Sequence, residues 1–492
     1  MSIASTSTSF TVSPPCSTIA SGPSVGSTHP ARSARTHGHD QRLRVVRETT
    51  RTGAPCGGAV GGQVPPVVGA DLLVPTVHGP VAYANLDHAA STPALVAVKA
   101  AVDAALETYS SVHRGNGYAS TVTSAWYEQA REEVASFVGA REDDTVVFTR
   151  NTTDSFNLLA RSLPRDTTVF VFETEHHSTL LPWKGARTVT LPVPASVEQA
   201  LEDLEAALAQ AHTRHRLVVV AGASNVTGEL WPLARIVRLA RRYQARVAVD
   251  AAQLAPHRAI DIETTGVDYV AFSGHKVYAP FGAGVLAGRA DWLDAAAPYL
   301  RGGGATARVT TAGPTWTTGP SRHEGGSPNV IGAIALAAAC ATITANRAAI
   351  EAHEGALLAQ LRSGLAVIPG IDTWSIFSDD HDRVGVVAFT IERLDSSLVS
   401  AILSAEHGIG VRDGKFCAHI LVDELLEDPW GEIPATAVRI SLGLSNTPEH
   451  VERVLAAVSQ LAADGPQRQY VRFEHGWLPE GDTRELTLPR PW

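Results

Sequence analysis

Lysine is scarce in this chain of 492 residues. Arginine is abundant, but the only lysines are Lys99, Lys184, Lys276 and Lys415. A search for an amine nucleophile is therefore limited to four positions.

Cysteine is scarce as well. The four cysteines are Cys16, Cys56, Cys340 and Cys417. Their wide spacing matches neither a disulfide framework nor a zinc site, so we expect no metal site. A reducing compartment fits this pattern best, and we expect a cytoplasmic protein.

Long basic runs and long apolar runs are also lacking. The formal net charge is −10, so nucleic acid is not an expected partner. The longest uncharged apolar run extends from Val330 to Ala345, which is too short to span a bilayer at ~20 residues. It predicts a buried helix, and no membrane contact is expected. Hydrophobic residues make up 44% and charged residues 18%, as in a globular protein of two or three domains.

Residues 1–70 differ from the rest in composition. Ser, Thr, Pro and Gly dominate, and no acidic residue precedes Asp40. We interpret this segment as a disordered tail. An organelle transit peptide is the alternative, whereas the continuous apolar segment of a secretory signal is lacking.

From Val146 onward, strand and helix patterns alternate. Strands are predicted over Val146–Thr149, Val169–Phe172, Leu217–Ala221, Val247–Asp250 and Tyr269–Phe272. Helices are predicted over Pro93–Thr108, Ser124–Val138, Val197–His212 and Leu233–Tyr243, with another that opens at Asn151–Asp154. This alternation predicts an α/β fold with a mostly parallel sheet covered by helices.

A second pattern follows the apolar run at Val330. Helices are predicted over Ala348–Leu365, Ser397–Ser404 and Pro448–Ala463, and strands over Val384–Ile391 and Ala437–Leu442. We therefore expect a large domain over 81–345 and a small α+β domain over 346–466, which residues 81–110 could join. Residues 467–492 form a C-terminal extension without clear periodicity.

Polar side chains follow five of the predicted strands. They are Thr152 and Thr153, His176 and His177, Asn225, Asp250 and Gln253, and Ser273, His275 and Lys276. Such sheets bind ligands beyond the carboxyl ends of their strands. Each group also has a simpler explanation, because the threonines can cap a helix, the histidines can lie on the surface and Asp250 can cap a following helix.

Lys276 is the most unusual of these residues. It lies just past an apolar strand, where an unpaired ammonium would be costly to bury. A lysine that forms a Schiff base escapes this cost and gains chemistry. The alternative is a loop lysine that points to solvent. Together the groups fit pyridoxal 5'-phosphate (PLP), which needs a lysine, a carboxylate at its pyridine nitrogen and a phosphate cup.

Several motifs identify the chain more closely. They are Glu175-His176-His177, Ser224-Asn225-Val226-Thr227-Gly228, Asp250-Ala251-Ala252-Gln253, Ser273-Gly274-His275-Lys276 and Arg322-His323-Glu324-Gly325-Gly326-Ser327-Pro328-Asn329. From about Asn85 to Ala463 the sequence resembles the class V aminotransferase family of fold-type I PLP enzymes. It is most similar to the cysteine desulfurase and selenocysteine lyase branch.

This resemblance implies roles by position. Lys276 would form the Schiff base and move protons on the substrate carbon, and Asp250 would pair with the pyridine nitrogen. His176 would stack on the ring, while Asn225 and Gln253 would bond near the phenolic oxygen. The phosphate would be held by Thr153, Ser273 and His275, with Thr152 nearby.

The resemblance also implies a homodimer. Ser327 stands where the family usually has a threonine that reaches the neighbouring subunit's phosphate. The segment His113–Ser120 resembles one that approaches the neighbouring site.

The segment Val411–His419 resembles the desulfurase loop Arg-x-Gly-x-x-Cys, in which the cysteine carries a persulfide. Cys417 would be that nucleophile, with Arg412 and Lys415 as nearby positive charges that lower its pKa. The alternative is a small packing residue in a loop. Asp413, Lys415 and Phe416 replace the usual Thr, His and His, so the substrate is less defined than the cofactor.

Arg439 matches the family arginine that holds the substrate carboxylate, and Arg412 could assist it. A surface arginine is the alternative. The leading hypothesis is a cysteine desulfurase-like enzyme with a possible sulfur-acceptor protein as partner. Transamination or epimerisation of another amino acid without a thiol is the second hypothesis, and a PLP-binding protein without turnover is the third.

Overall fold

The computed structural model describes residues 63–426, 435–474, 476–488 and 490–492. The predicted disordered tail lies outside these ranges, except for residues 63–70. In that stretch Val67 is buried and forms an antiparallel bridge with Leu95. Strand β1 (Leu73–Thr76) follows, so regular structure begins earlier than the predicted Val81.

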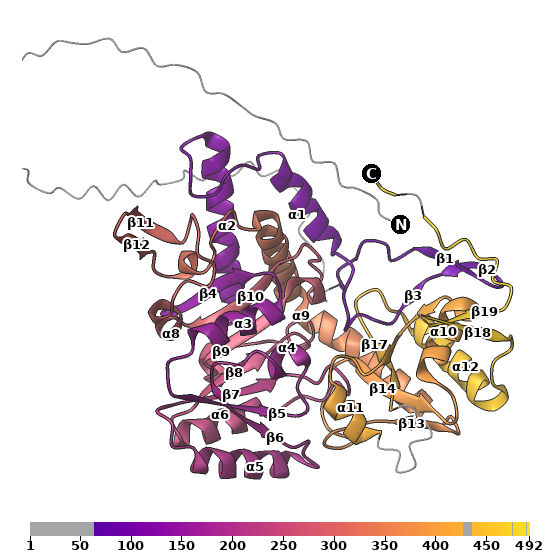
Figure 1. The fold of residues 1–492 in the computed structure, drawn as a ribbon. Coiled ribbons are helices and arrows are strands. Elements are labelled where there is room, and N and C mark those ends of the chain that lie inside the picture. Colours follow the sequence, from indigo (N-terminus) through magenta and orange to yellow (C-terminus); the bar gives the residue numbers. More distant parts are fainter. Residues whose placement is uncertain (1–62, 427–434, 475, 489) are drawn as a thin grey trace, which may run out of the picture. The chain divides into compact units, whose positions relative to one another are not determined.

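A seven-stranded sheet lies within the segment predicted as the large domain (Figure 1). Its strands, in spatial order, are β4 (Asp144–Thr149), β10 (Gly284–Arg289), β9 (Tyr269–Ser273), β8 (Arg246–Asp250), β7 (His215–Ala221), β5 (Thr167–Phe172) and β6 (Arg187–Leu191). Strand β10 is antiparallel to both of its neighbours, and all other pairs are parallel. The expected mostly parallel α/β fold is therefore confirmed, although β6 and β10 were not predicted.

Both faces of this sheet are buried, because successive side chains of a strand point to opposite faces. In β7, Val218 and Val220 belong to one apolar core, and Leu217 and Val219 belong to the other. The first core is covered by α1 (Val96–Leu106), α2 (Tyr118–Phe137), α5 (Val197–Gln210), α6 (Leu233–Arg242) and the amino-terminal half of α9 (Val330–Leu365). The second is covered by α3 (Thr152–Ser162) and α8 (Ala290–Ala295). This double cover explains why the strands are nearly continuous apolar runs.

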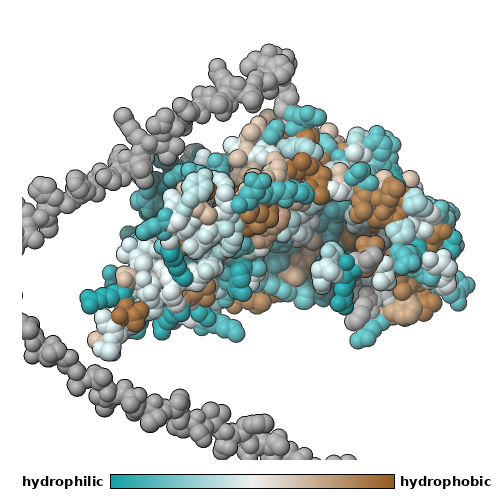
Figure 2. All heavy atoms as spheres, turned by 90° about the horizontal axis from the view of Figure 1, so that it is seen from above, coloured by the Kyte–Doolittle hydropathy of each residue, from teal (hydrophilic) through white to brown (hydrophobic). Residues whose placement is uncertain are grey.

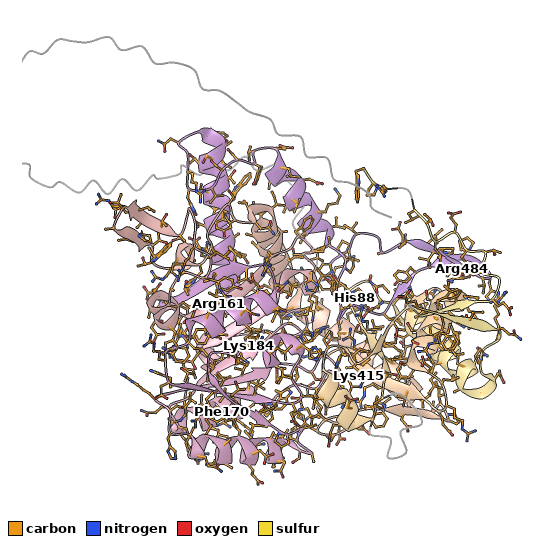
Figure 3. The ribbon with its side chains drawn as sticks, in the orientation of Figure 1. His88, Arg161, Phe170, Lys184, Lys415 and Arg484 are labelled. Atoms are coloured by element: carbon orange, nitrogen blue, oxygen red, sulfur yellow. The ribbon has the colours of Figure 1, made fainter. Side chains whose placement is uncertain are left out.

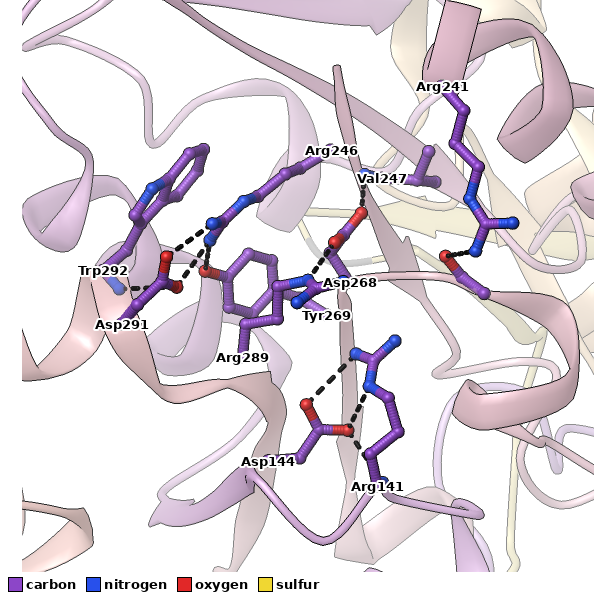
Figure 4. A network of polar contacts seen from close by, with 11 residues as sticks. Arg141, Asp144, Arg241, Arg246, Val247, Asp268, Tyr269, Arg289, Asp291 and Trp292 are labelled. Atoms are coloured by element: carbon purple, nitrogen blue, oxygen red, sulfur yellow. Dashed lines mark hydrogen bonds and ion pairs between the residues drawn. The ribbon is translucent and has the colours of Figure 1, made fainter. Parts of the chain in front are cut away.

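Ion pairs occupy the edge of the sheet where β4, β8 and β9 begin (Figure 4). Arg246 Nη1 donates to Asp291 at 2.7 Å and to the hydroxyl of Tyr269 at 2.9 Å. Asp268 accepts from Arg289 and from the backbone N–H of Val247. These charged side chains link the starts of the strands to the adjoining loops. The cavity described below lies at the opposite edge of the sheet, where the parallel strands end.

Two predicted helix starts were wrong. Helix α1 begins at Val96 rather than Pro93, because Thr92 and Leu95 are tied by backbone hydrogen bonds to His275 and Tyr278 in the loop after β9. Helix α2 begins at Tyr118 rather than at the predicted Ser124. There the hydroxyl of Ser120 donates to the carbonyl oxygen of Ser111 and fixes the first turn.

Helix α9 is a single helix where two were predicted. By length and composition it could cross a bilayer, yet Leu336 lies in the apolar core of the seven-stranded sheet and Leu361 in a second apolar core, with residues of the C-terminal part of the chain. The polar pair between the two predicted helices does not interrupt it. Asn346 donates to the carbonyl oxygen of Thr342, and Arg347 donates to the carbonyl oxygen of Ala255.

A four-stranded antiparallel sheet lies in the C-terminal part of the chain. Its order is β13 (Ile371–Thr373), β14 (Val386–Ile391), β17 (Ala437–Ser441) and β16 (Arg412–Gly414). The helices here are α10 (Ser396–His407), α11 (His419–Leu425) and α12 (Pro448–Asp464). Strand β15 (Ile409–Gly410) pairs with β3 (Ala84–Asn85), so residues from the start of the described chain join this part.

The C-terminal extension forms a hairpin of β18 (Tyr470–Phe473) and β19 (Gly476–Pro479). It is fastened to α10, because Tyr470 donates its hydroxyl to Glu406 at 2.8 Å and Trp477 donates its indole N–H to Ser397 at 3.1 Å. Two further hairpins pair β1 with β2 (Gly79–Ala82) and β11 (Thr306–Thr310) with β12 (Gly313–Trp316). Figure 2 shows hydrophobic side chains in separate patches between hydrophilic ones, as is usual for a protein surface.

Candidate active site

A cavity of about 460 Å³ opens at the carboxyl edge of the sheet. It is lined by predicted site residues that are far apart in the sequence, namely Thr152, Thr153, His176, Asn225, Asp250, Gln253, Ser273, His275, Lys276, Arg412, Cys417 and Arg439. Ser327 does not line it. That residue is exposed and lines a second cavity, together with Arg150 and Tyr299.

Lys276 ends a 3₁₀ turn, Gly274–Lys276, directly after β9. Burial lowers the pKa of its ammonium from the usual 10.5 to about 8, against the opposing effect of Asp250. Arg439 lowers the pKa further. A substantial fraction of Lys276 is therefore the neutral, nucleophilic amine near neutral pH.

Asp250 is the last residue of β8 and is buried. One carboxylate oxygen accepts from the hydroxyl of Thr179 at 2.7 Å, and the other accepts from the backbone N–H of Ala252 at 2.9 Å. These two donors fix the orientation of the carboxylate at the cavity wall.

His176 precedes the short helix α4 (His177–Leu180) as its N-cap. Its Nδ1 accepts from the backbone N–H of Ser178 at 3.0 Å, so the ring proton lies on Nε2. Burial, followed by the charge of Lys276, lowers the pKa of His176 to about 4. The imidazole is thus a neutral flat ring in the cavity.

The amino terminus of α3 forms one end of the cavity. Asn151 caps the helix by accepting from the N–H of Asp154 at 3.0 Å. Ser273 Oγ accepts from the backbone N–H of Thr152 at 2.9 Å and lies 2.8 Å from its hydroxyl. Thr153 is exposed. A helix N-terminus with hydroxyl groups is suited to an anion such as phosphate.

His275 lies beside this end of the cavity. Its Nδ1 is 3.3 Å from the hydroxyl of Ser91. Burial and the charge of Lys276 lower the pKa of His275. At neutral pH this ring is therefore a hydrogen-bonding group rather than a cation.

The two amide side chains, Asn225 and Gln253, are both buried and both hold backbone carbonyl groups. Gln253 donates to Ala89 at 2.8 Å, and Asn225 donates to Phe416 at 2.8 Å. Each amide therefore links a strand end of the central sheet to another segment that lines the cavity.

Arg439 is 3% exposed in the middle of β17. Its Nη1 donates to the carbonyl oxygen of Asn225 at 2.9 Å, and its Nη2 donates to Asp87 at 3.1 Å. Its Nε has no hydrogen-bond partner among the described residues. Arg412, on the neighbouring strand β16, is exposed and lies opposite Arg439 in the register of the two strands. A buried guanidinium with a free N–H is suited to a ligand carboxylate.

Cys417 is exposed and lines the same cavity. The expected help from Lys415 was wrong, because its ammonium is paired with Asp423 of α11 instead; Figure 3 shows Lys415 beside this helix. Cys340 is fully buried in α9, and burial raises the pKa of its thiol. Cys417 is therefore the accessible thiol of the described residues.

Comparison with known proteins decides the family. The sequence pattern of the family described as aminotransferase class-V matches residues 84–454. This chain belongs to the class-V aminotransferase family. A cysteine desulfurase from Dickeya dadantii (strain 3937) is 36% identical over 401 residues, which cover 79% of this chain and 94% of that protein. A cysteine desulfurase from Klebsiella pneumoniae (strain 342) is 33% identical over 395 residues, which cover 78% and 93%.

Solved structures of cysteine desulfurases are also similar to this chain. The apo structure of a cysteine desulfurase from Thermococcus onnurineus NA1 has a TM-score of 0.70 and 31% identity, over 77% of this chain and 94% of that chain. A cysteine desulfurase from Escherichia coli has a TM-score of 0.66 and 32% identity, over 77% and 94%. The fold-type I architecture is therefore confirmed.

The class-V family implies PLP as the cofactor, and the residues present fit this group. One cavity combines a lysine of lowered pKa, a fixed carboxylate, a neutral imidazole and a helix N-terminus with hydroxyl groups. These are the groups that an aldehyde, a pyridine nitrogen, an aromatic ring and a phosphate require. Lys276, Asp250, His176 and the Thr152–Ser273 pair would hold the cofactor.

Sequence reasoning missed three functional neighbours in this class-V site. Asp87 pairs with Arg439, Thr179 holds Asp250, and Phe416 lines the cavity. Thr179 follows a recognised motif within a few positions, which is a usable signal. Asp87 lies far from Arg439 in sequence, and Phe416 was noted only as a departure from the desulfurase pattern.

Proposed function

We propose that this PLP-dependent class-V enzyme removes sulfur from L-cysteine and yields L-alanine. The observation that carries the proposal is that Cys417, Lys276 and Arg439 line one cavity. A thiol, an amine of lowered pKa and a carboxylate-binding arginine are the groups that desulfuration of an amino acid needs.

Three residues of the cavity would have separate roles in the reaction. Arg439, whose side chain lines the cavity, would bind the α-carboxylate, and the neutral amine of Lys276 would take the proton from Cα. When bound, PLP withdraws electrons from Cα. His176, neutral with its proton on Nε2, would keep the ring plane in place.

The sulfur step would then use Cys417. Its thiolate attacks the sulfur of the substrate, a new S–S bond forms and the substrate Cβ–S bond breaks. The electron pair of that bond stays on Cβ, which takes up a proton and becomes the methyl group of alanine. The alanine is then released. The enzyme retains the sulfur as a persulfide on Cys417, so no external oxidant is needed.

We also propose that the enzyme is a cytoplasmic homodimer that passes this sulfur to an acceptor protein. The exposure of Cys417 supports a direct transfer to a second protein. The exposed Ser327, in a cavity separate from Lys276 of its own chain, supports a role across a subunit interface.

The test is to incubate the PLP-loaded enzyme with L-cysteine and dithiothreitol, and to measure alanine and sulfide. Wild type should form both in equal amounts, Cys417→Ala should form neither, and Cys340→Ala should act like wild type because that thiol is buried. If wild type forms no alanine, the desulfurase proposal is wrong. Turnover of another amino acid that is unaffected by Cys417→Ala would then favour a reaction without a thiol.

A further inference from the structure

The backbone around Cys417 is in an unusual conformation. Phe416 has φ 52° and Cys417 has φ 55°, so two successive residues with a Cβ atom occupy the left-handed region. This conformation is strained for a residue with a Cβ atom and persists only where the surroundings hold it. The structure must therefore contain contacts that fix this turn.

Two hydrogen bonds from segments that follow strands of the central sheet provide such contacts. Asn225 Nδ2 donates to the carbonyl oxygen of Phe416 at 2.8 Å. The backbone N–H of His177 donates to the carbonyl oxygen of Cys417 at 2.9 Å. The two residues of the turn are thus held from the walls of the cavity that carry the cofactor-binding groups.

The side chain of Phe416 provides the third contact. It is 7% exposed and packs in an apolar cluster with Ala388 of β14, Ala437 of β17, Leu421 and Val422 of α11, and three residues outside these elements, Val226, Ile376 and Ala418. The guanidinium carbon of Arg439 lies 5.0 Å from the centre of its ring. A cation at this distance from an aromatic ring is attracted to it, more strongly when both are buried.

We propose that Phe416 is a positioning residue that couples substrate binding at Arg439 to the placement of Cys417. Its ring packs against the guanidinium of Arg439. Cys417 is the next residue in the chain, so the anchored backbone of Phe416 fixes where the thiol lies. The proposal rests on the proposed function, because it assigns Cys417 the role of nucleophile.

The two parts of this role can be separated by two substitutions. Phe416→Leu keeps a buried apolar side chain but removes the ring, so Arg439 should bind carboxylates less well. KM for L-cysteine should rise about threefold to tenfold, with a smaller change in kcat. Phe416→Ala also removes the anchor in the apolar cluster, so kcat for desulfuration should fall about tenfold or more because the thiol is misplaced.

A second reaction shows whether the effect is specific to the thiol. Exchange of the Cα hydrogen of L-alanine with deuterated solvent depends on Lys276 and Arg439 but not on Cys417. In Phe416→Ala its kcat should stay within about twofold of wild type. Hydrogen exchange of the backbone over residues 412–420 should become faster in the same variant, which is a readout that needs no turnover.

Leu421→Ala is the matched control, because Leu421 is fully buried in the same apolar cluster and lies in α11. It should lower thermal stability without changing KM or the ratio of the two reactions. The proposal is overturned if Phe416→Ala slows both reactions by the same factor, or if neither Phe416 variant differs from Leu421→Ala. If wild type makes no alanine from L-cysteine, the proposed function fails, and the alanine-exchange KM still reports whether Phe416 supports Arg439.

Discussion

At the scale of single residues, the lowered pKa of Lys276 has a measurable consequence. Only the neutral amine can attack the aldehyde of PLP, so apoenzyme should capture PLP faster as pH rises through about 8. The rate should level off above that pH rather than near the usual 10.5. Visible absorbance after mixing at each pH measures this. Lys276→Ala should not develop the visible absorption band of the Schiff base. A midpoint of the capture rate near pH 10.5 would contradict the lowered pKa of Lys276.

Asp250 gives a second prediction at this scale. Asp250→Asn removes the charge that would pair with the pyridine nitrogen, so kcat should fall by about 10²–10³-fold. The charge of Asp250 also raises the pKa of Lys276, so the midpoint of PLP capture should move below that of wild type. Steady-state kinetics and the same absorbance titration measure the two effects.

Asp268→Asn is the control for this substitution. Asp268 pairs with Arg289 at the opposite edge of the sheet, so its loss should reduce stability and leave both the midpoint and kcat close to wild type. Equal kinetic effects of the two variants would show that Asp250 acts through folding alone.

Residue types and motifs predicted most of the candidate site, because chemistry restricts which side chains can follow each strand. Lys276, Asp250 and Arg439 line one cavity as expected. Asp87 was not predicted, since its contact with Arg439 joins opposite ends of the described chain. Lys415 was assigned to the thiol from closeness in sequence, but a helix partner, Asp423, takes its charge.

At the scale of elements, the buried strands were predicted well because apolar runs without polar interruption are typical of a sheet covered on both faces. Strand β6 was missed because three of its five residues are exposed. Strand β10 was missed because it begins in a glycine-rich stretch, Phe281-Gly282-Ala283-Gly284, which is typical of a turn. In fact Gly284 opens the strand, and an added Cβ would lie 2.5 Å from the backbone of Asn151.

The C-terminal hairpin gives a prediction at this scale. Tyr470 donates to Glu406, which is 4% exposed. Tyr470→Phe removes the donor from a buried carboxylate, so the free energy of unfolding should fall by about 1–3 kcal/mol. Chemical denaturation measures this. Tyr109→Phe, at a residue that is 52% exposed, should change it little; equal effects would mean that the hairpin contact does not stabilise α10.

At the scale of the whole molecule, Ser327 tests the proposed homodimer. Its hydroxyl does not line the cavity that contains Lys276 of the same chain, so it can assist cofactor binding only from a second subunit. Light scattering should then give twice the chain mass of 51.9 kDa. Ser327→Ala should weaken PLP binding about threefold to tenfold through the loss of one hydrogen bond to phosphate.

Dilution separates a contribution from the partner subunit from an indirect effect within one chain. If the hydroxyl comes from the partner, the difference in PLP affinity between wild type and Ser327→Ala should disappear at protein concentrations where the dimer dissociates. Ser321→Ala, in the same region, is the control because its hydroxyl bonds within its own turn, to Thr318. A difference that persists in the monomer would show that Ser327 acts within its own chain, and a monomer at all concentrations would remove the basis for shared sites.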